Sequence, residues 1–256
     1  MDVGMEQKIN EINKIYQAAD ITMLPEFISR YGCDTRPGVV TILTKARKKI
    51  DALEKEKKRS YQMSSFEREY ASYSYLCGID EVGRGPLAGP VVAGAVILKK
   101  ECSILYLNDS KQLSAKKREE LYEIIMDQAI ATGIGLVSPE RIDEINILQA
   151  TYEAMGEAIY NLGVTPDILL NDAVTIPKVN IKQVPIIKGD AKSISIAAAS
   201  IIAKVTRDKL MIQYDEIMPE YGFASNKGYG SAMHIEALKK YGPTPIHRRS
   251  FIKNFI

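Results

Sequence analysis

Apolar side chains recur every three or four positions through the first part of the chain, which is the spacing that lines one face of a helix. This pattern occurs in residues 9–19, 24–31 and 39–53. Gly32 follows the second of these segments, at a position where helices commonly end. Residues 60–73 lack the pattern. We therefore predict a small all-α domain over residues 1–70 and a second domain over residues 71–256.

Short apolar segments appear after residue 74 and alternate with helical ones. Strands are predicted at residues 75–79, 91–98, 134–137, 167–170 and 184–187, and helices at 115–131, 139–162, 191–218 and 231–241. Two strands joined directly, followed by strands that alternate with helices, are typical of a mixed sheet. The second domain is therefore predicted to be α/β.

Composition narrows the class of protein. Of the 256 residues, 46% are hydrophobic and 26% are charged, which is typical of a globular protein. No apolar run approaches the roughly 18 residues of a membrane span, and the start of the chain lacks the apolar segment of a signal peptide. The three cysteines are scattered, which argues against a disulfide framework and against a structural zinc site. We expect a cytoplasmic protein that does not contact membranes.

Basic residues gather in two places, although the net charge is only +2. Residues 45–59 hold eight Lys or Arg against three Asp or Glu, and residues 226–256 hold six against one. Such segments favour a polyanionic partner such as nucleic acid. The first segment is equally typical of a solvated helix face, so both interpretations stay open for it.

Acidic residues follow three of the predicted strands. They are Asp80 and Glu81, then Asp172, then Asp190. Functional groups of open α/β sheets gather where strands end, so these carboxylates are expected to meet. Carboxylates that are packed together repel one another, and divalent cations relieve the repulsion. Hard oxygen ligands favour Mg²⁺ or Mn²⁺ over zinc. Any one of these acids alone is more typical of an ordinary turn, so the prediction rests on the set.

The glycines of residues 83–89 invite two interpretations. A dinucleotide-binding turn also follows a strand, but its spacing is GxGxxG, whereas this segment reads GxGxxxG. Pro86 and Pro90 also flank the place where that motif needs a helix to begin, and Asp80-Glu81 would repel a pyrophosphate. A Gly-Arg-Gly turn beside a metal site instead lets the backbone approach a sugar–phosphate chain closely. We favour this second interpretation.

Six longer segments add a resemblance. They are GIDEVGRGPLAGPVVAGAVIL (78–98), LNDSKQLS (107–114), DILLNDA (167–173), KGDAKSISIAAASIIAKVTRD (188–208), NKGYGS (226–231) and YGPTPIHRRSF (241–251). In this order and spacing they resemble the bacterial ribonuclease HII family over about residues 75–251. The resemblance implies an RNase H-like fold, which is a mixed five-stranded sheet flanked by helices. The helical first 70 residues are similar to extensions of some Gram-positive members.

The resemblance also implies roles for individual residues. The family's catalytic, metal-binding carboxylates match Asp80, Glu81, Asp172 and Asp190. The turn that senses the ribonucleotide matches Gly83, Arg84 and Gly85. Tyr229 matches a tyrosine that stacks on the deoxyribose 3′ of the ribonucleotide. Together, turn and tyrosine would recognise the 2′-hydroxyl, the one group that separates RNA from DNA at that position.

The implied activity is that of a type 2 ribonuclease H. Such an endonuclease hydrolyses the phosphodiester 5′ of ribonucleotides in RNA–DNA hybrids, or of single ribonucleotides embedded in duplex DNA. Two ions of Mn²⁺ or Mg²⁺ would serve as cofactors. The hydrolysis would leave a 3′-hydroxyl and a 5′-phosphate. We expect the protein to act as a monomer on these nucleic acids.

Three further residues are weaker candidates for phosphate contacts: Ser110, Lys111 and Lys204. A turn cap and a surface lysine would look the same in the sequence. Ser193, Ser195 and Ser200 are expected to serve packing in a helix. His247-Arg248-Arg249-Ser250-Phe251 is expected either to contact the nucleic-acid backbone or to pack the C-terminus, with packing favoured for His247 and Phe251.

Two alternatives to this function stay open. The first is an enzyme like ribonuclease HIII, which prefers longer hybrid stretches. Arg84 argues against it, because that sister family usually has Lys there, and its N-terminal domain is rich in strands. The second is a nucleic-acid-binding protein without catalysis. The four acids argue against that, because carboxylates without a cation would weaken phosphate binding.

Overall fold

The structure is a computed structural model that describes residues 7–102 and 104–256. Residues 1–6, which belong to the start where no signal peptide is predicted, lie outside the described residues, as does residue 103. The chain divides into two compact units, residues 1–61 and 62–256. The division falls within α3 (Pro37–Met63), somewhat before the predicted domain boundary at residue 70.

The first unit is built from amphipathic helices. They are α1 (Ile9–Ala18), the 3₁₀ turn η1 (Ile21–Met23), α2 (Leu24–Tyr31) and most of α3. Their apolar faces meet in one core made of Ile12, Tyr16, Leu24, Phe27, Tyr31, Val39, Ile42, Leu43 and Ala46. Burying each large side chain contributes roughly 1.5–3 kcal/mol, which explains why periodic apolar spacing suffices to specify these helices. The prediction of an all-α N-terminal region is confirmed.

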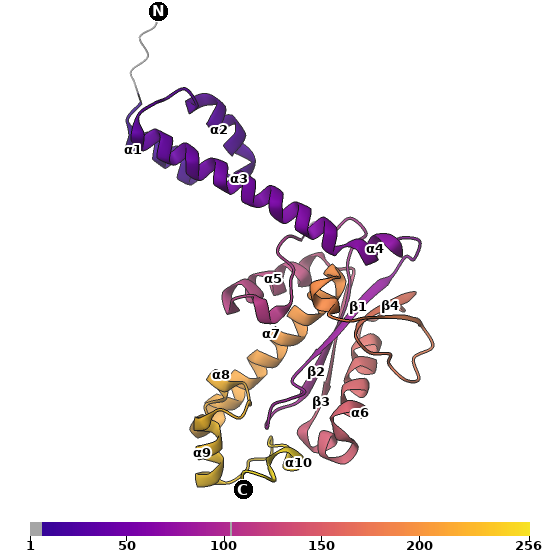
Figure 1. Ribbon diagram of the computed structural model, residues 1–256. Coiled ribbons are helices and arrows are strands. Elements are labelled where there is room, and N and C mark those ends of the chain that lie inside the picture. Colours follow the sequence, from indigo (N-terminus) through magenta and orange to yellow (C-terminus); the bar gives the residue numbers. More distant parts are fainter. Residues whose placement is uncertain (1–6, 103) are drawn as a thin grey trace, which may run out of the picture. The chain divides into compact units, whose positions relative to one another are not determined.

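The second unit contains a five-stranded sheet. Its strands are β1 (Leu76–Val82), β2 (Val91–Ile97), β3 (Ala131–Val137), β4 (Ile168–Asp172) and β5 (Lys182–Ile186). In space their order is β3-β2-β1-β4-β5 (Figure 1). The first three strands pair antiparallel, while β4 and β5 run parallel to β1. The predicted mixed five-stranded sheet is therefore confirmed.

Helices cover both faces of this sheet. The second unit contains α4 (Ser65–Glu69), α5 (Ala115–Gln128), α6 (Pro139–Tyr160), α7 (Ile194–Ile217), α8 (Phe223–Asn226), α9 (Ala232–Tyr241), α10 (Arg249–Ile252) and the 3₁₀ turns η2 (Ser110–Gln112), η3 (Gly189–Ala191) and η4 (Pro219–Tyr221). One apolar cluster joins α6 to the sheet, and a second joins α5 and α7 to its other face. In Figure 1, α6 and α7 accordingly lie on opposite sides of β1 and β2.

Glycine in β1 lets α7 approach the strand closely. A Cβ added to Gly78 would lie 2.1 Å from the main-chain carbon of Ser195, so no larger residue fits there. Ile79 packs on the α6 side instead. Because strand side chains alternate between faces, Asp80 lies on the same face as Gly78, toward α7. This packing places the first candidate carboxylate beside the middle of a buried helix.

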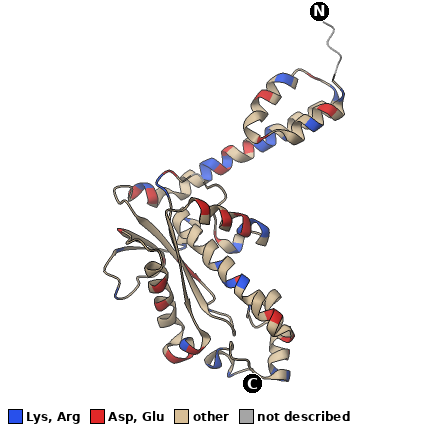
Figure 2. Ribbon diagram, turned by 180° about the vertical axis from the view of Figure 1, so that it is seen from behind, with Lys and Arg blue, Asp and Glu red and all other residues tan. Residues whose placement is uncertain are grey.

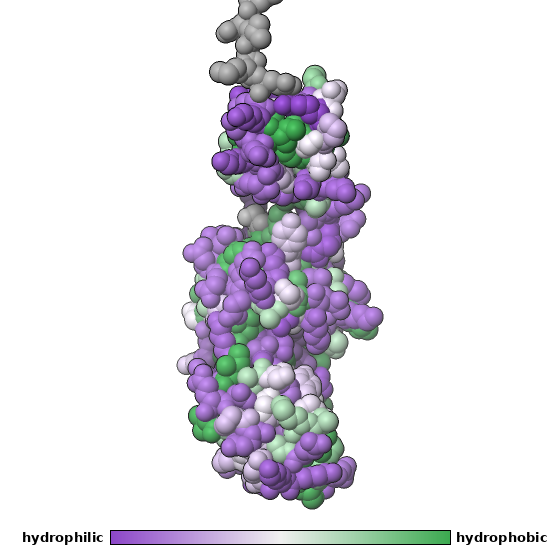
Figure 3. All heavy atoms as spheres, turned by 90° about the vertical axis from the view of Figure 1, so that its left-hand side faces the viewer, coloured by the Kyte–Doolittle hydropathy of each residue, from purple (hydrophilic) through white to green (hydrophobic). Residues whose placement is uncertain are grey.

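The surface shown in Figure 3 is mostly hydrophilic, and its apolar side chains lie in small separate groups. Among the described helices, none combines the length and the apolar character needed to cross a membrane.

Candidate active site

The sheet brings Asp80 and Asp172 to the same level on neighbouring strands. In the parallel pair of β1 and β4, Ile79 lies opposite Asn171, and each of the two aspartates follows next in its strand. The prediction that Asp80 and Glu81 follow the end of a strand is wrong, because β1 continues to Val82 by pairing with β2. The strand predicted to end at residue 170 likewise continues, and Asp172 is the last residue of β4.

Asp190 reaches the same edge through a tight turn after β5. Lys188 adopts a left-handed conformation, with φ 57°, and the 3₁₀ turn η3 begins directly afterwards. The main-chain N–H of Gly189 donates a hydrogen bond of 2.8 Å to Asp172 Oδ1. Asp190 is therefore held next to the end of β4. The edge formed by Asp80, Glu81, Asp172 and Asp190 is called the acid edge below.

Burial and neighbouring carboxylates raise the pKa of three members of the acid edge: Asp80, Glu81 and Asp190. Burial raises the pKa of Asp80 well above its usual value, and the charges of Glu81 and Asp172 add to the shift. Burial likewise raises the pKa of Glu81, although the guanidinium of Arg84 opposes it from 3.2 Å. Burial, followed by Asp109 and Asp172, raises the pKa of Asp190 to about 6. The edge thus holds more negative charge than its surroundings neutralise.

The segment 109–111 lies beside the acid edge. Asp109 is hydrogen-bonded to Asp190, and the sequence interpretation assigned it no role, although it lies in the quoted LNDSKQLS segment. Partial burial lowers the pKa of Lys111, but Asp109, Asp80 and Asp190 outweigh this effect and raise it overall. Lys111 is therefore attracted by the acid edge.

Two serines are hydrogen-bonded to each other beside Asp80. Ser110 has only 3% of its surface exposed, and its hydroxyl is hydrogen-bonded to that of Ser200 at 2.9 Å. Ser200 is also hydrogen-bonded to Asp80, which lowers the pKa of that carboxyl. Ser200, which was expected only to pack, therefore supports a candidate site residue. The buried hydroxyl of Ser110 faces this support and does not face solvent.

The turn of residues 83–85 lies next to Tyr229. Gly83 has φ 89°, and a Cβ there would meet the Arg207 side chain, so both conformation and space require glycine. An added Cβ on Gly85 would lie 3.9 Å from a ring carbon of Tyr229. The Tyr229 side chain is 44% exposed. The structure thus brings together two elements that are far apart in the sequence.

Two buried arginines donate hydrogen bonds to this turn and to the segments beside it. Arg248 has no exposed surface and donates to the carbonyl oxygens of Gly83, Arg84 and Gly89. Arg207, also fully buried, donates to the carbonyls of Ala88, Pro90 and Lys227. Burial lowers the pKa of Arg248 to about 9, and the charge of Arg207 adds to the shift. Arg248 therefore packs inside the protein and does not contact a ligand directly. Its carbonyl partners lie about 160 residues away in the sequence, so sequence patterns could not predict these contacts.

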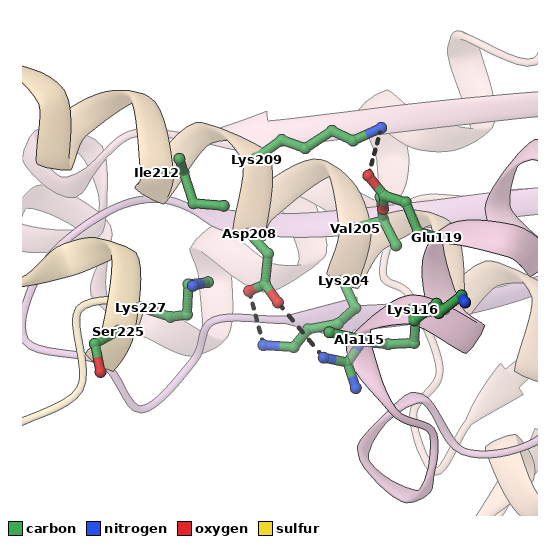
Figure 4. A pocket seen from close by; sticks show the side chains of 11 residues that line it. Ala115, Lys116, Glu119, Lys204, Val205, Asp208, Lys209, Ile212, Ser225 and Lys227 are labelled. Carbon is green, nitrogen blue, oxygen red and sulfur yellow. Dashed lines mark hydrogen bonds and ion pairs between the residues drawn. The ribbon is translucent and has the colours of Figure 1, made fainter.

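Lys204 lines a separate basic pocket between α5, α7 and α8, with a volume of about 540 Å³ (Figure 4). Its ammonium donates to Asp208 at 2.8 Å, and burial lowers the pKa of Lys204. The pocket is also lined by other cations, among them Lys116, Lys209 and Lys227. The ribbon of Figure 2 shows basic positions on α7 and a basic run on α3. In that run, Arg59 pairs with Glu56.

The donor set of the acid edge fits a hard divalent cation. All its side-chain donors are carboxylate oxygens, which Mg²⁺ and Mn²⁺ prefer. Burial, with the neighbouring carboxylates adding to it, raises the pKa of Asp80 and of Asp190, and a cation would favour their charged forms. Over residues 7–102 and 104–256, however, no three His, Cys, Asp or Glu side chains are arranged to hold one ion as they stand. The acid edge therefore has the chemistry of a metal site without a closed cage.

Comparison with known proteins decides the family. The model of the family described as Ribonuclease HII matches residues 77–254, and that of the Ribonuclease HII N-terminal domain matches residues 8–71. The chain belongs to the ribonuclease HII family. It is a type 2 ribonuclease H, an endonuclease of a family that depends on divalent metal and acts on RNA–DNA hybrids.

Individual relatives agree with this assignment. A ribonuclease HII of Lachnoclostridium phytofermentans is 63% identical over 250 residues, covering 98% of both chains. One of Clostridioides difficile is 52% identical over 98% of this chain and 99% of its own. The crystal structure of ribonuclease H2 from Pyrococcus horikoshii matches with a TM-score of 0.58 and 32% identity, covering 68% of this chain and 92% of that one. The predicted RNase H-like fold is thereby confirmed.

Proposed function

We propose that this ribonuclease HII cuts the phosphodiester on the 5′ side of a ribonucleotide, including a single one embedded in duplex DNA, and leaves a 3′-hydroxyl and a 5′-phosphate. The observation that carries this proposal is the acid edge. Asp80 and Asp172 share one level of the sheet, and the Gly189–Asp172 hydrogen bond tethers Asp190 beside them. Several carboxylates at one strand edge are what hydrolysis assisted by two metal ions requires.

In this proposal Asp80, Glu81, Asp172 and Asp190 hold two ions of Mg²⁺ or Mn²⁺. When bound, the ions would activate the attacking water and stabilise the leaving 3′ oxygen. Asp80 would be the central ligand of this set, because Glu81 follows it in β1 and Asp172 lies at the same level of β4. Ser200 and the main-chain N–H of Glu81, which donates to Asp80 Oδ1 at 2.8 Å, keep this carboxylate oriented.

The turn of residues 83–85 and Tyr229 are proposed to recognise the ribonucleotide. Arg248 binds the carbonyl oxygens of Gly83 and Arg84 from inside the protein. Because a trans peptide directs its N–H opposite to its C=O, this arrangement leaves the N–H groups on the side away from Arg248. Main-chain donors there suit a sugar hydroxyl and its flanking phosphates. The half-exposed ring of Tyr229 beside Gly85 offers an aromatic face to the neighbouring sugar.

Lys111 and Lys204 are proposed to contact phosphates. Lys111 is exposed beside the acid edge, where substrate must lie. Lys204 belongs to the basic pocket of Figure 4, whose cations suit the sugar–phosphate backbone at a distance from the cut. Ser110, in contrast, is proposed to act from below through Ser200. We further propose that the enzyme works as a cytoplasmic monomer.

A cleavage assay tests this function. Three labelled duplexes, with one ribonucleotide, with four and with none, are incubated with the protein and with Mg²⁺ or Mn²⁺. We expect cuts 5′ of the ribonucleotide in the first two duplexes and none in the third. Cutting of only the four-ribonucleotide duplex would point to activity like that of ribonuclease HIII. Binding without any cutting would overturn the proposal.

Asp80→Asn provides the matched control. The amide keeps the size of the side chain and can still accept the N–H of Glu81, but it removes a negative charge from the acid edge. We expect this variant to bind the single-ribonucleotide duplex and not to cut it. If it cuts at the rate of the unchanged protein, Asp80 is not a catalytic residue.

A further inference from the structure

The two histidines of the chain are joined in a buried chain of hydrogen bonds. His247 Nε2 and His234 Nε2 lie 2.9 Å apart. The other ring nitrogen of His234, Nδ1, lies 2.8 Å from the carbonyl oxygen of Tyr229. At the opposite end, the main-chain N–H of Thr244 donates to His247 Nδ1 at 3.0 Å, and the Thr244 hydroxyl, 2.8 Å from the same nitrogen, can donate to it as well. The chain thus runs from Thr244 through both imidazoles to Tyr229.

The partners at the two ends determine where the protons lie. A main-chain N–H can only donate, so His247 Nδ1 accepts and its proton is on Nε2. That proton is donated to His234 Nε2, which leaves the second proton on His234 Nδ1. A carbonyl oxygen can only accept, and His234 Nδ1 faces that of Tyr229. One arrangement of two neutral rings therefore satisfies every partner.

The surroundings of the pair keep it uncharged. His234 is fully buried and His247 nearly so, and the rings of Tyr221 and Phe223 pack against both of them. Burial lowers the pKa of His234, and burial together with His234 lowers that of His247 to about 4. If either imidazole were protonated, both of its nitrogens would carry a hydrogen. One of these hydrogens would then face the N–H of its partner, either the other imidazole or Thr244. The pair is thus a fixed element at neutral pH.

Tyr229 lies at the outer end of this chain. Its carbonyl accepts from His234 and also from the N–H of Ser231 at 2.8 Å, and its own N–H donates to Asn226 at 3.0 Å. The main chain of Tyr229 is therefore held on both sides, while its ring stays exposed beside Gly85. The segment of His247 is itself bound to the loop that follows Gly85, because Arg248 N–H donates to Leu87 and Gly89 N–H donates to Ile246.

We propose that His234 and His247 are positioning residues for substrate recognition, which set the place of the Tyr229 ring relative to the turn of residues 83–85. This inference rests on the proposed function, since it assigns the pair to the recognition of the sugar at the cut. The pair acts through the Tyr229 carbonyl and touches no substrate. A ring held in advance loses less freedom on binding, so the expected effect is on substrate affinity.

The proton arrangement is tested first, without any activity. In protein labelled with ¹⁵N-histidine only two imidazoles are present, and long-range ¹H–¹⁵N spectra at pH 7 distinguish the tautomers. We expect His247 protonated on Nε2 and His234 on Nδ1. A His234 ring protonated on Nε2, or an imidazolium in either position, would overturn the proposal.

Kinetics on the single-ribonucleotide duplex test the role. His247→Phe keeps a ring and removes the donor to His234, so Tyr229 is held less firmly. We expect KM to rise about threefold to tenfold, with kcat changed less than twofold, because stacking on a sugar is made already in the bound ground state. His247→Gln places an amide donor near Nε2 and should restore most of the loss. A fall in kcat alone, or no rescue by Gln, would contradict the proposal.

A double-mutant cycle separates positioning from general damage. In a Tyr229→Ala background, where KM is expected to be raised about tenfold or more, His247→Phe should have no further effect on KM. Phe223→Leu is the matched control, because it loosens packing on both histidines and leaves their hydrogen bonds. It should lower stability without raising KM. Additive effects of His247→Phe and Tyr229→Ala, or an equal rise of KM in Phe223→Leu, would show that the pair is merely structural.

These outcomes can be told apart from a failure of the proposed function. If the unchanged protein cuts none of the duplexes, the function is wrong, whereas the tautomer measurement still tests the geometry. If the protein cuts and the His247 variants behave like the unchanged protein, only the positioning role is wrong.

Discussion

The acid edge and the loop beside it both contain buried charged groups, but the groups differ in sign and in their hydrogen-bond partners. In the acid edge, burial and mutual repulsion raise the pKa values of Asp80 and Asp190. Arg248, which donates to carbonyls of the loop of residues 83–90, has its pKa lowered by burial to about 9. In both regions, burial therefore disfavours the charged form of the side chain. They differ in what surrounds the charge, and that difference separates a site that must receive a ligand from one that is already complete.

Arg248 shows what a complete site looks like. Each of the three guanidinium nitrogens of Arg248, and likewise of Arg207, donates to a main-chain carbonyl. The carboxylates lie beside one another, and Lys111, Arg84 and the hydroxyl of Ser200 compensate their charge in part. A buried charge without a partner is costly, so the acid edge favours a cation from solution. In the proposed function, charge at the edge serves the reaction, whereas charge below the loop supports the conformation of the loop.

The largest expected effect comes from Asp172→Asn. The amide oxygen can still accept the N–H of Gly189, while one negative charge disappears. We expect kcat to fall roughly a thousandfold, because metal-assisted charge stabilisation is lost. The melting temperature should stay equal or rise, since repulsion is relieved. Single-turnover cleavage and thermal unfolding measure the two effects. Lower activity accompanied by a lower melting temperature would indicate that Asp172 is structural.

Asp109→Asn sharpens the same comparison at the border of the acid edge. Removing this charge should lower the pKa of Asp190, which Asp109 raises. Because Asp109 is not one of the proposed metal residues, we expect kcat to fall less than about tenfold. This loss is smaller than the one expected when a metal ligand is removed, since a metal contributes several kcal/mol to the stability of the transition state. A loss as large as that of Asp172→Asn would place Asp109 among the catalytic residues.

Arg248→Met tests the loop side. The substitution leaves the carbonyls of Gly83, Arg84 and Gly89 without their buried donors. We expect the free energy of unfolding to fall by about 3 kcal/mol. The control is Arg249→Met, which changes an exposed neighbour and should alter stability by less than about 0.5 kcal/mol. Urea denaturation measures both, and equal effects would mean that the buried contacts of Arg248 contribute little.

The pH dependence of stability tests the neutral histidine pair. Unfolded histidine has a pKa of about 6.5, whereas that of folded His247 is about 4. Between these values the unfolded chain binds more protons, so stability falls as the pH falls from about 6.5 to 4. For His247 the loss is on the order of 2 kcal/mol. His247→Gln should therefore flatten the pH dependence over this window. An unchanged slope would contradict a neutral buried imidazole.

The smallest expected effect concerns the basic pocket. If Lys116 contacts a phosphate, Lys116→Gln should reduce the slope of log K against log salt by about 0.9 and weaken all duplexes alike. The control is Lys182, a residue of β5 that donates to the Tyr73 hydroxyl and does not line the pocket. Lys182→Gln should leave the slope unchanged. Titrations at several salt concentrations measure the slope. Equal slopes in all three proteins would remove Lys116 from the interface.

Much of the fold could be predicted because periodic apolar spacing is a local property. The helix α5 begins at Ala115 after the cap Ser114, and α6 at Pro139 after the cap Ser138, as predicted. The strand ends were harder. The extension of β1 to Val82 depends on pairing with β2, and Asp80 lies opposite Gly94 there. The sequence of one strand alone does not determine how far it pairs with its neighbour.

Roles of polar residues divide in the same way. Asp172 and Asp190 could be proposed from their positions after apolar strands. Ser200 could not, because its contact with Asp80 depends on how closely α7 lies against Gly78. Arg248 has the sequence surroundings of a surface cation, yet it is fully buried.

The sequence by itself determined the helical first unit, the α/β character of the second, the family and the candidate carboxylates, because hydrophobic period and motif spacing are local. Only the tertiary structure decided how the acid edge differs from the loop beside it. Whether a buried charge is satisfied depends on carbonyls and side chains brought from distant segments, as for Arg248 and the His234–His247 pair. Those partners meet only when the chain packs.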